Sequence, residues 1–198
     1  MRLKNNYFIL RHGYSLRNEK HVASCWPETK LYPLTEKGEK EAERAARKAK
    51  KEKIDLIFYS DLLRTRQTAL IVAEKLGLKP KPDKRLREIK VGIFNNQPID
   101  KFASFWNKDK RLDMADYYKI RFKKAPPKGE TYDDVEKRMI AFVKEIESKY
   151  KGKNILIVSH QRPLTLLEKA LFGYSMEKFI EVIKNKKEIK TGQLKKLI

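Results

Sequence analysis

The sequence has very little cysteine and no long apolar run. Cys25 is the one cysteine among 198 residues, which excludes an intramolecular disulfide and any multi-cysteine metal motif. No stretch approaches the roughly 18 apolar residues of a membrane-spanning helix. Residues 1–6 also lack the apolar core of a secretory signal. We therefore expect a cytoplasmic protein with no membrane partner.

Histidine is also scarce, with three residues in the chain. His12 and His160 each follow a short apolar run, at residues 7–10 and 154–158, that is typical of a buried strand. In an open α/β sheet the carboxyl ends of the strands line the ligand crevice. A lone histidine is most often a structural residue, but two histidines at equivalent strand ends indicate a shared site.

The residues around these strand ends suit an anion. Histidine can act as a nucleophile, and Arg11 beside it can hold an anion with a planar set of N–H donors. A further buried strand is expected at 54–59, and we expect Ser60 and Asp61 to cap a helix from residue 62 to about residue 76. Arg64 falls in the first turns of that helix, where free amides and the helix dipole attract phosphate.

The remaining segments complete an α/β pattern. Helices are expected at 35–51, with Thr35 as N-cap and an inward alanine stripe, at 99–122, at 131–150 and after Pro163. An extended edge segment is expected at 79–84, and closing strands at 179–183 and 193–198. Because no linker, repeat or low-complexity tract divides the chain, we expect a single α/β domain over residues 1–198.

The net charge of +21 has two interpretations. One is contact with the phosphate backbone of a nucleic acid. The other is a solvated, lysine-rich surface, with some of the charge used for an anionic substrate. The sequence contains no zinc-finger spacing, aromatic RNP stretch or glycine-rich phosphate loop. A nucleic-acid partner is therefore disfavoured, although it stays open as an alternative.

Six motifs follow one another along nearly the whole chain. They are Arg11-His12-Gly13 with Asn18, residues 33–38, residues 60–69, residues 86–89 with Gly92, residues 129–131 and residues 158–160. In this order they resemble the histidine phosphatase superfamily, which includes cofactor-dependent phosphoglycerate mutases and many small phosphatases. The resemblance implies an α/β fold, a three-layer α/β/α sandwich with a mainly parallel central sheet. It also implies a phosphohistidine enzyme with no metal, and we expect no cofactor.

Carried over residue by residue, the resemblance gives each group a role. His12 would take the phosphoryl group, and Glu88 would donate a proton to the leaving oxygen. The groups that surround the phosphate would be Arg11, Asn18, Arg64, His160 and Gln161. Departures from the family pattern that bear on the shape of the pocket are Tyr14, Gln161 and the pair Asn95 and Asn96.

These roles agree with the chemistry of phosphoryl transfer. Negative charge spreads over the phosphoryl oxygens in the transition state, where fixed cationic donors stabilise it most. His12 must be neutral at its attacking nitrogen, so its other nitrogen should donate to a nearby backbone carbonyl. Glu88 must carry a proton near neutral pH, which requires partial burial or neighbouring carboxylates.

The resemblance leaves the acceptor of the phosphoryl group open. We expect a phosphatase that hydrolyses a small-molecule phosphate ester, with a 2,3-bisphosphoglycerate-dependent phosphoglycerate mutase as the alternative. A homodimer also stays open. The basic, aromatic-rich segment 97–128 is expected to form a flap beside the pocket. Its residues Arg121, Lys123 and Lys124 either steer charged esters or form an ordinary solvated face.

Overall fold

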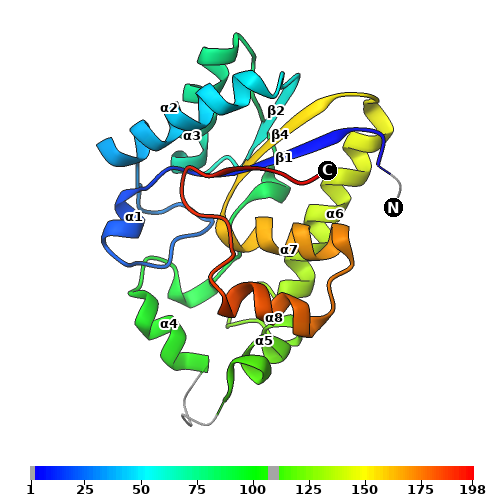
Figure 1. Cartoon of the computed structure of the whole chain (residues 1–198). Helices are drawn as coiled ribbons and strands as arrows, with labels where there is room; N and C mark the ends of the chain where they lie inside the picture. Colours follow the sequence, from blue (N-terminus) through cyan, green and yellow to red (C-terminus); the bar gives the residue numbers. More distant parts are fainter. Residues whose placement is uncertain (1–2, 107–111) are drawn as a thin grey trace.

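The computed structural model describes residues 3–106 and 112–198, and a five-stranded sheet lies at its centre (Figure 1). The bounds of the strands are β1 Asn6–Arg11, β2 Leu56–Tyr59, β3 Lys81–Pro82, β4 Asn154–Ser159 and β5 Leu194–Lys196. They lie in the order β3-β2-β4-β1-β5. β5 is antiparallel to β1, and the other neighbours are parallel. The expected α/β fold with a mainly parallel sheet is confirmed.

Helices cover both faces of this sheet. Their bounds are α1 Leu16–Glu19, α2 Glu36–Lys51, α3 Leu63–Leu76, α4 Ile99–Trp106, α5 Met114–Lys123, α6 Tyr132–Lys149, α7 Gln161–Phe172 and α8 Met176–Lys184, with the 3₁₀ turns η1 Lys84–Leu86 and η2 Gly92–Phe94. Within residues 3–106 and 112–198, none of the helices has both the length and the apolar character needed to cross a membrane.

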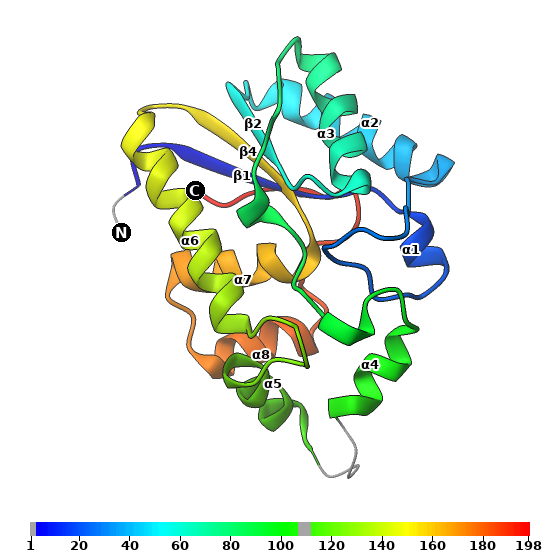
Figure 2. The same ribbon diagram turned by 180° about the vertical axis from the view of Figure 1, so that it is seen from behind.

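The sheet lies between two helical layers (Figures 1 and 2). Side chains alternate along a strand, so Phe8 and Leu10 pack with α2 and α3, whereas Tyr7 and Ile9 pack with α6 and α7. Because both faces are buried, the strands are apolar along their length. The predicted alanine stripe of α2 is buried and comprises Ala42, Ala45, Ala46 and Ala49. The three-layer α/β/α sandwich is confirmed.

The first turn of α2 lies against the loop that follows β1. Thr35 is the N-cap, as predicted, and its Oγ1 accepts a hydrogen bond from Gly38 N at 3.3 Å. A Cβ on Gly38 would lie 1.9 Å from the carbonyl oxygen of Tyr14, and a Cβ on Gly13 would lie 2.2 Å from the carbonyl oxygen of Gly38. Glycine at both positions lets the two backbones touch. This contact fixes where the chain goes immediately after His12.

α4, α5 and α8 gather at one end of the molecule, away from α2 and α3 (Figure 1). α5 packs on α8 through Tyr118 and Phe122, whose ring centroids lie 5.7 Å and 5.5 Å from that of Phe179. Where a single helical region was expected at 99–122, the structure has two helices, α4 and α5. Residues 107–111, which include the predicted basic positions Lys108, Lys110 and Arg111, lie outside the described residues.

The strand predicted at 179–183 is wrong, because these residues are part of α8. Phe179, Ile180 and Ile183 follow the spacing of one helix face and pack on the core. Ser175 caps this helix, because its side chain accepts from Lys178 N at 3.2 Å. The apolar run alone could not distinguish the two structures.

The predicted cap of α3 is also wrong. The N-cap residue is Leu62, which has no side-chain cap of its own. Instead Glu28, from a distant loop, accepts a hydrogen bond from Leu63 N at 2.9 Å. Ser60 and Asp61 bond elsewhere, Ser60 to His160 and Asp61 to Arg87. A carboxylate from another part of the chain thus supplies the acceptor that the first turn of this helix needs.

Candidate active site

His12 and His160 are neighbours because β1 and β4 are adjacent parallel strands. Arg11 pairs with Ser159 across the two strands, and His12 N donates to the carbonyl oxygen of Ser159 at 3.1 Å. The two imidazole centroids lie 5.2 Å apart. Arg64 contacts both rings, since α3 follows β2 and β2 lies next to β4. The structure brings these predicted residues together at the carboxyl edge of the sheet.

His12 is held in a single tautomer. Its side chain is buried, and Nδ1 lies 2.8 Å from the backbone carbonyl oxygen of Gly13. A carbonyl oxygen can only accept, so Nδ1 carries the proton and Nε2 keeps its lone pair. Arg64 Nε donates to that Nε2 at 3.3 Å. The backbone acceptor that we expected for His12 is present.

Arg64 is buried completely, and all three nitrogens of its guanidinium donate hydrogen bonds. Besides the bond to His12, Nη1 donates to Ser24 Oγ at 3.3 Å and Nη2 to the carbonyl oxygen of Ser24 at 3.1 Å. The Glu28 carboxylate lies 3.8 Å from Nη1. These contacts hold the planar donor group against the two histidines, in the orientation that suits a bound anion.

His160 has the opposite tautomer. Its Nδ1 lies 3.2 Å from Arg64 Nη2, which can only donate, so Nδ1 accepts. The proton is then on Nε2, which donates to Ser60 Oγ at 2.8 Å. Both histidines are neutral in this arrangement, and both direct a lone pair toward the same guanidinium.

The electrostatics of the site agree with neutral imidazoles beside permanent cations. Burial, followed by the charges of Arg64 and Arg11, lowers the pKa of His12 well below its usual 6.5. Burial and Arg64 lower the pKa of His160 in the same way. Burial also lowers the pKa of Arg11 and that of Arg64 to about 10, and Glu88 opposes both shifts. Both guanidiniums therefore stay charged at neutral pH and attract a phosphate.

Arg11 is held by the segment that precedes β5. Its Nη1 donates to the carbonyl oxygen of Ile189 at 3.3 Å. Gly192 N lies 3.1 Å from the Arg11 carbonyl oxygen and 3.2 Å from that of His12. Arg11 Nε is buried with no hydrogen-bond partner among the described residues. A buried donor without an acceptor, next to the candidate nucleophile, is what an anion site would leave before its ligand binds.

Glu88 lies on the other side of this cluster, two residues after η1. It is partly buried, and its Oε1 accepts from Ile89 N at 3.0 Å. Burial lowers the pKa of Arg11 and that of Arg17, and the negative charge of the Glu88 carboxylate opposes both shifts. Glu88 lines the same pocket as Arg17 and Gln161.

The backbone of Glu88 is positioned from α6. Arg138 Nη2 donates to the Glu88 carbonyl oxygen at 3.3 Å, and Arg138 Nε pairs with Glu130 Oε1 at 3.0 Å. Glu130 Oε2 also accepts from Lys90 N at 2.8 Å. The motif at 129–131 thus has a clear physical task, because it fixes the loop that carries Glu88.

The other two predicted contacts lie on α1 and at the start of α7. Asn18 Oδ1 accepts from Ser15 N at 3.2 Å and from Ser15 Oγ at 2.9 Å, so its Nδ2 amide is the group that could donate to a phosphate. Gln161 is the first residue of α7, directly after His160, and lines a pocket beside Glu88.

Sequence reasoning missed three residues that support the site. Ser24 and Glu28 lie in an irregular loop without periodicity, which gave no signal of their contact with Arg64. Thr68 Oγ1 accepts from Gly13 N at 3.1 Å and donates to the Arg64 carbonyl oxygen at 2.8 Å. Its position four residues after Arg64, on the same face of α3, was the one available signal.

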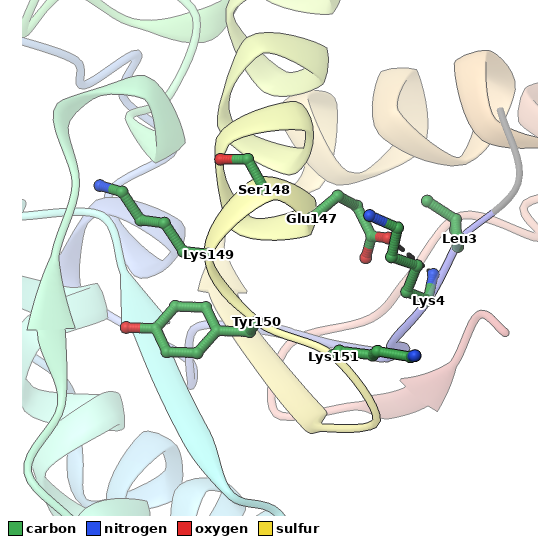
Figure 3. Close-up of a pocket in the computed structure, with 7 residues that line it drawn as sticks. All are labelled: Leu3, Lys4, Glu147, Ser148, Lys149, Tyr150 and Lys151. Carbon is green, nitrogen blue, oxygen red and sulfur yellow. Dashed lines mark hydrogen bonds between the residues drawn. The ribbon is translucent and has the colours of Figure 1, made fainter.

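A second hollow lies next to the amino-terminal end of β1 (Figure 3). Glu147 in its wall accepts from Lys4 N at 2.6 Å, from Asn5 Nδ2 at 2.7 Å and from Tyr7 Oη at 2.7 Å. The carboxylate is thus used to hold the start of β1 against α6. This hollow is structural, and the histidine–arginine cluster remains the candidate site. The fold and that cluster define the class as an α/β protein with a candidate anion-binding site at the carboxyl edge of its sheet.

Comparison with known proteins agrees with this class. A family model described as the histidine phosphatase superfamily (branch 1) matches residues 7–189. The chain therefore belongs to the histidine phosphatase superfamily, and the expectation of an enzyme of the phosphatase class is confirmed.

Relatives carry several names. Phosphoserine phosphatase 1 of Hydrogenobacter thermophilus is 28% identical over 166 residues, which cover 81% of this chain and 77% of that protein. A probable phosphoglycerate mutase of Yersinia pestis is 32% identical over 169 residues, which cover 84% and 74%. The solved structure of a mycobacterial glucosyl-3-phosphoglycerate phosphatase has a TM-score of 0.78 and 22% identity, over 96% of this chain and 88% of that one. This last likeness shows the shared fold.

Proposed function

We propose that this chain hydrolyses phosphate monoesters through a phosphohistidine intermediate on His12. The observation that carries the proposal is the 2.8 Å contact between His12 Nδ1 and the Gly13 carbonyl oxygen, which leaves the Nε2 lone pair facing Arg64. A nucleophilic nitrogen beside fixed cationic donors is the arrangement that phosphoryl transfer needs.

In the first step Arg64 Nε–H exchanges its hydrogen bond to His12 Nε2 for one to a phosphoryl oxygen, the freed Nε2 lone pair attacks phosphorus, and the bond from phosphorus to the ester oxygen breaks. Glu88 gives its proton to the departing oxygen, so the alcohol leaves neutral. Arg11 and Arg64 donate to the phosphoryl oxygens, where negative charge is greatest in the transition state. The Nδ1–H bond to Gly13 strengthens as the imidazole becomes cationic.

In the second step a water molecule attacks phosphorus, and the bond between phosphorus and His12 Nε2 breaks. Glu88, now a carboxylate, takes the proton that the water loses, and inorganic phosphate leaves. His160 keeps the Arg64 guanidinium oriented through both steps. Asn18, through its Nδ2 amide, and Gln161, at the start of α7, supply further contacts to the substrate.

The decisive test is the trapping of the phosphoenzyme. Wild-type protein quenched in acid during turnover should carry an acid-labile phosphoryl group, and His12→Ala should carry none and lose nearly all turnover. His21→Ala, which removes the exposed histidine, is the matched control and should keep full activity. An acid-stable phosphoserine, or normal turnover by His12→Ala, would overturn the proposal. Turnover should also survive EDTA, because no step above uses a metal.

A phosphoglycerate mutase is the second candidate, and the 32% identity to a probable phosphoglycerate mutase favours it. The two activities differ in the acceptor of the phosphoryl group. A phosphatase releases inorganic phosphate, whereas a mutase interconverts phosphoglycerates when primed with 2,3-bisphosphoglycerate. Measuring both products with and without that compound decides between them. The single domain over 1–198, the cytoplasmic location and the assembly state stay predictions.

A further inference from the structure

A pocket of about 300 Å³ adjoins the phosphate site. Ser24, Glu88 and Gln161 line the wall nearest to that site, and residues of α4, α5 and α6 form the outer wall. Because Glu88 is proposed to protonate the leaving oxygen, this pocket is where the leaving group of a substrate would lie. Its volume is at the lower end of the roughly 300–1,000 Å³ of small-molecule sites, which fits a small leaving group.

The pocket is lined by three arginines with different partners. Arg162 is paired, because its Nη1 lies 2.9 Å from the carboxylate of Glu188. Arg17 and Arg121 form no ion pair with any carboxylate in residues 3–106 and 112–198. Neither arginine therefore has a carboxylate within ion-pair distance in the described part of the chain, and the Glu88 carboxylate in the same pocket acts on Arg17 from a longer distance, where it opposes the lowering of the Arg17 pKa by burial.

Arg121 is the stronger indication of a ligand. Its side chain is 0% exposed, and in the described part of the chain its Nε has no hydrogen-bond partner. The guanidinium lies over the rings of Trp106, Tyr132 and Phe102, at 4.3 Å, 4.8 Å and 5.4 Å from their centroids. Contact with aromatic rings compensates only part of the cost of burying an ion. An anion would supply the missing charge and acceptor.

We propose that Arg17 and Arg121 bind a second anionic group, a carboxylate or a phosphate, on the leaving group of the substrate. This inference rests on the proposed phosphatase function. Arg17 is partly exposed, and its Nε is fixed by the Val22 carbonyl oxygen at 2.9 Å. Because Arg121 is buried, binding at its guanidinium requires that the ring of Phe102, which is partly exposed at the pocket wall, turn aside.

This geometry also changes the steering hypothesis for the flap. Lys123 and Lys124 are exposed, and Lys123 pairs with Asp133 at 3.1 Å. Arg121 is buried, so it acts on a substrate through contact, and long-range steering is the wrong role for it. Lys124 provides a matched control, because it carries the same charge three residues away without lining the pocket.

The experiment uses three esters that differ in one group. Glycerol 3-phosphate has an uncharged leaving group, 3-phosphoglycerate has a carboxylate in place of the terminal alcohol carbon, and glycerol 1,3-bisphosphate carries a phosphate on the terminal alcohol. We expect the wild type to have a higher kcat/KM, measured by phosphate release, for at least one of the anionic esters. Whichever ester is favoured identifies the group that is bound. Equal kcat/KM for all three esters would overturn the proposal.

Arg121→Met should lower kcat/KM for the favoured ester by about 10–100-fold, the range for a lost charge-assisted hydrogen bond. Its activity on glycerol 3-phosphate should change little. Arg17→Met should show the same pattern, and Lys124→Gln should change neither ester. A uniform loss on all three esters in Arg121→Met would show a structural role and overturn the proposal.

Stability gives a second readout for the same variant. Methionine replaces an unneutralised buried cation with an apolar side chain of similar length, so Tm without ligand should be unchanged or higher. A lower Tm together with uniform loss of activity would contradict the proposed binding role.

Calorimetric titration of the His12→Ala protein separates this inference from the proposed function. The favoured ester should bind more tightly than glycerol 3-phosphate, and adding Arg121→Met should remove the difference. If that binding is found but the wild type hydrolyses no ester, the result supports the proposed subsite and contradicts the proposed phosphatase function. If the wild type hydrolyses esters but this binding difference is absent, the result contradicts the proposed subsite and supports the proposed phosphatase function.

Discussion

Substitution of Arg64 can separate the charge of this residue from its geometry. Arg64 donates through Nε to His12 Nε2 at 3.3 Å and through Nη2 to His160 Nδ1 at 3.2 Å, and no part of its side chain is exposed. Lysine keeps the charge but cannot reproduce the planar set of donors. Glutamine at this position loses both the charge and the planar guanidinium set of donors. Both variants should therefore lose kcat, whereas only Arg64→Gln should alter the titration of the two histidines.

The magnitude follows from the number of donors at the site. Loss of one donor to a transition-state oxygen lowers kcat by about 10²–10³-fold. We expect about 10²-fold for Arg64→Lys and about 10³-fold or more for Arg64→Gln. Removing the charge should raise the pKa of His12 and that of His160. Burial remains the largest cause of the lowering, so both values should still lie below 6.5.

Steady-state kinetics on p-nitrophenyl phosphate measure the first effect, with Tm as a check on folding. Nuclear magnetic resonance of the imidazole nitrogens measures the second, since the chain has three histidines and the third, His21, is exposed. The same spectra should show Nδ1–H for His12 and Nε2–H for His160. Near-normal kcat in Arg64→Lys, or unchanged histidine titration in Arg64→Gln, would refute the reasoning.

Glu88→Gln should lower the rate on an alkyl phosphate by about 10²–10⁴-fold and the rate on p-nitrophenyl phosphate much less, because a good leaving group needs little help from an acid; equal losses would indicate a positioning role. Glu147→Ala should lower the free energy of unfolding by about 3 kcal/mol, since two buried donors, on Asn5 and Tyr7, and the partly buried Lys4 amide lose their acceptor at about 1 kcal/mol each. Urea unfolding measures this change, and wild-type stability would contradict it. Acid should also destabilise the protein, because folding lowers the pKa of His12 and that of His160. Below about pH 6.5 the unfolded chain binds protons that the folded histidines do not, so the free energy of unfolding is highest above that pH and decreases as pH falls. Unfolding free energies at pH 7.5 and 5.5 should differ less in His12→Ala than in the wild type, and an equal difference would argue against burial of a neutral His12.

The proximity of His12, His160 and Arg64 could be predicted from sequence because its signals are local. His12 and His160 each follow an apolar strand, and parallel strands place their carboxyl ends at one edge of the sheet. Arg64 follows β2 by a few residues, so the same rule brings it to that edge. The tautomer of His12 was also predictable, since a nucleophilic nitrogen needs a proton on the other ring nitrogen.

The remainder depends on contacts between distant segments. Glu28 caps α3 from 35 residues away, and no local pattern indicates that partner. Arg121 belongs to a run of basic residues that resembles a solvated helix face, yet it is buried among aromatic rings. The run at 179–183 is apolar enough for a strand or a helix, and packing against α5 decides for the helix. These features follow from tertiary packing, which composition and periodicity do not encode.

The position of β1 in the sheet has a consequence during synthesis. β1 is translated before both of its partners, because Asn6 pairs with Asn154, 148 positions further along the chain, and β5 comes later still. At about 5–20 residues per second, β1 waits roughly 7–30 s for its neighbours. Until then His12 lacks the Ser159 carbonyl oxygen and the Gly192 amide that hold its backbone. A nascent or prematurely terminated chain that lacks β4 and β5 therefore cannot assemble the candidate site.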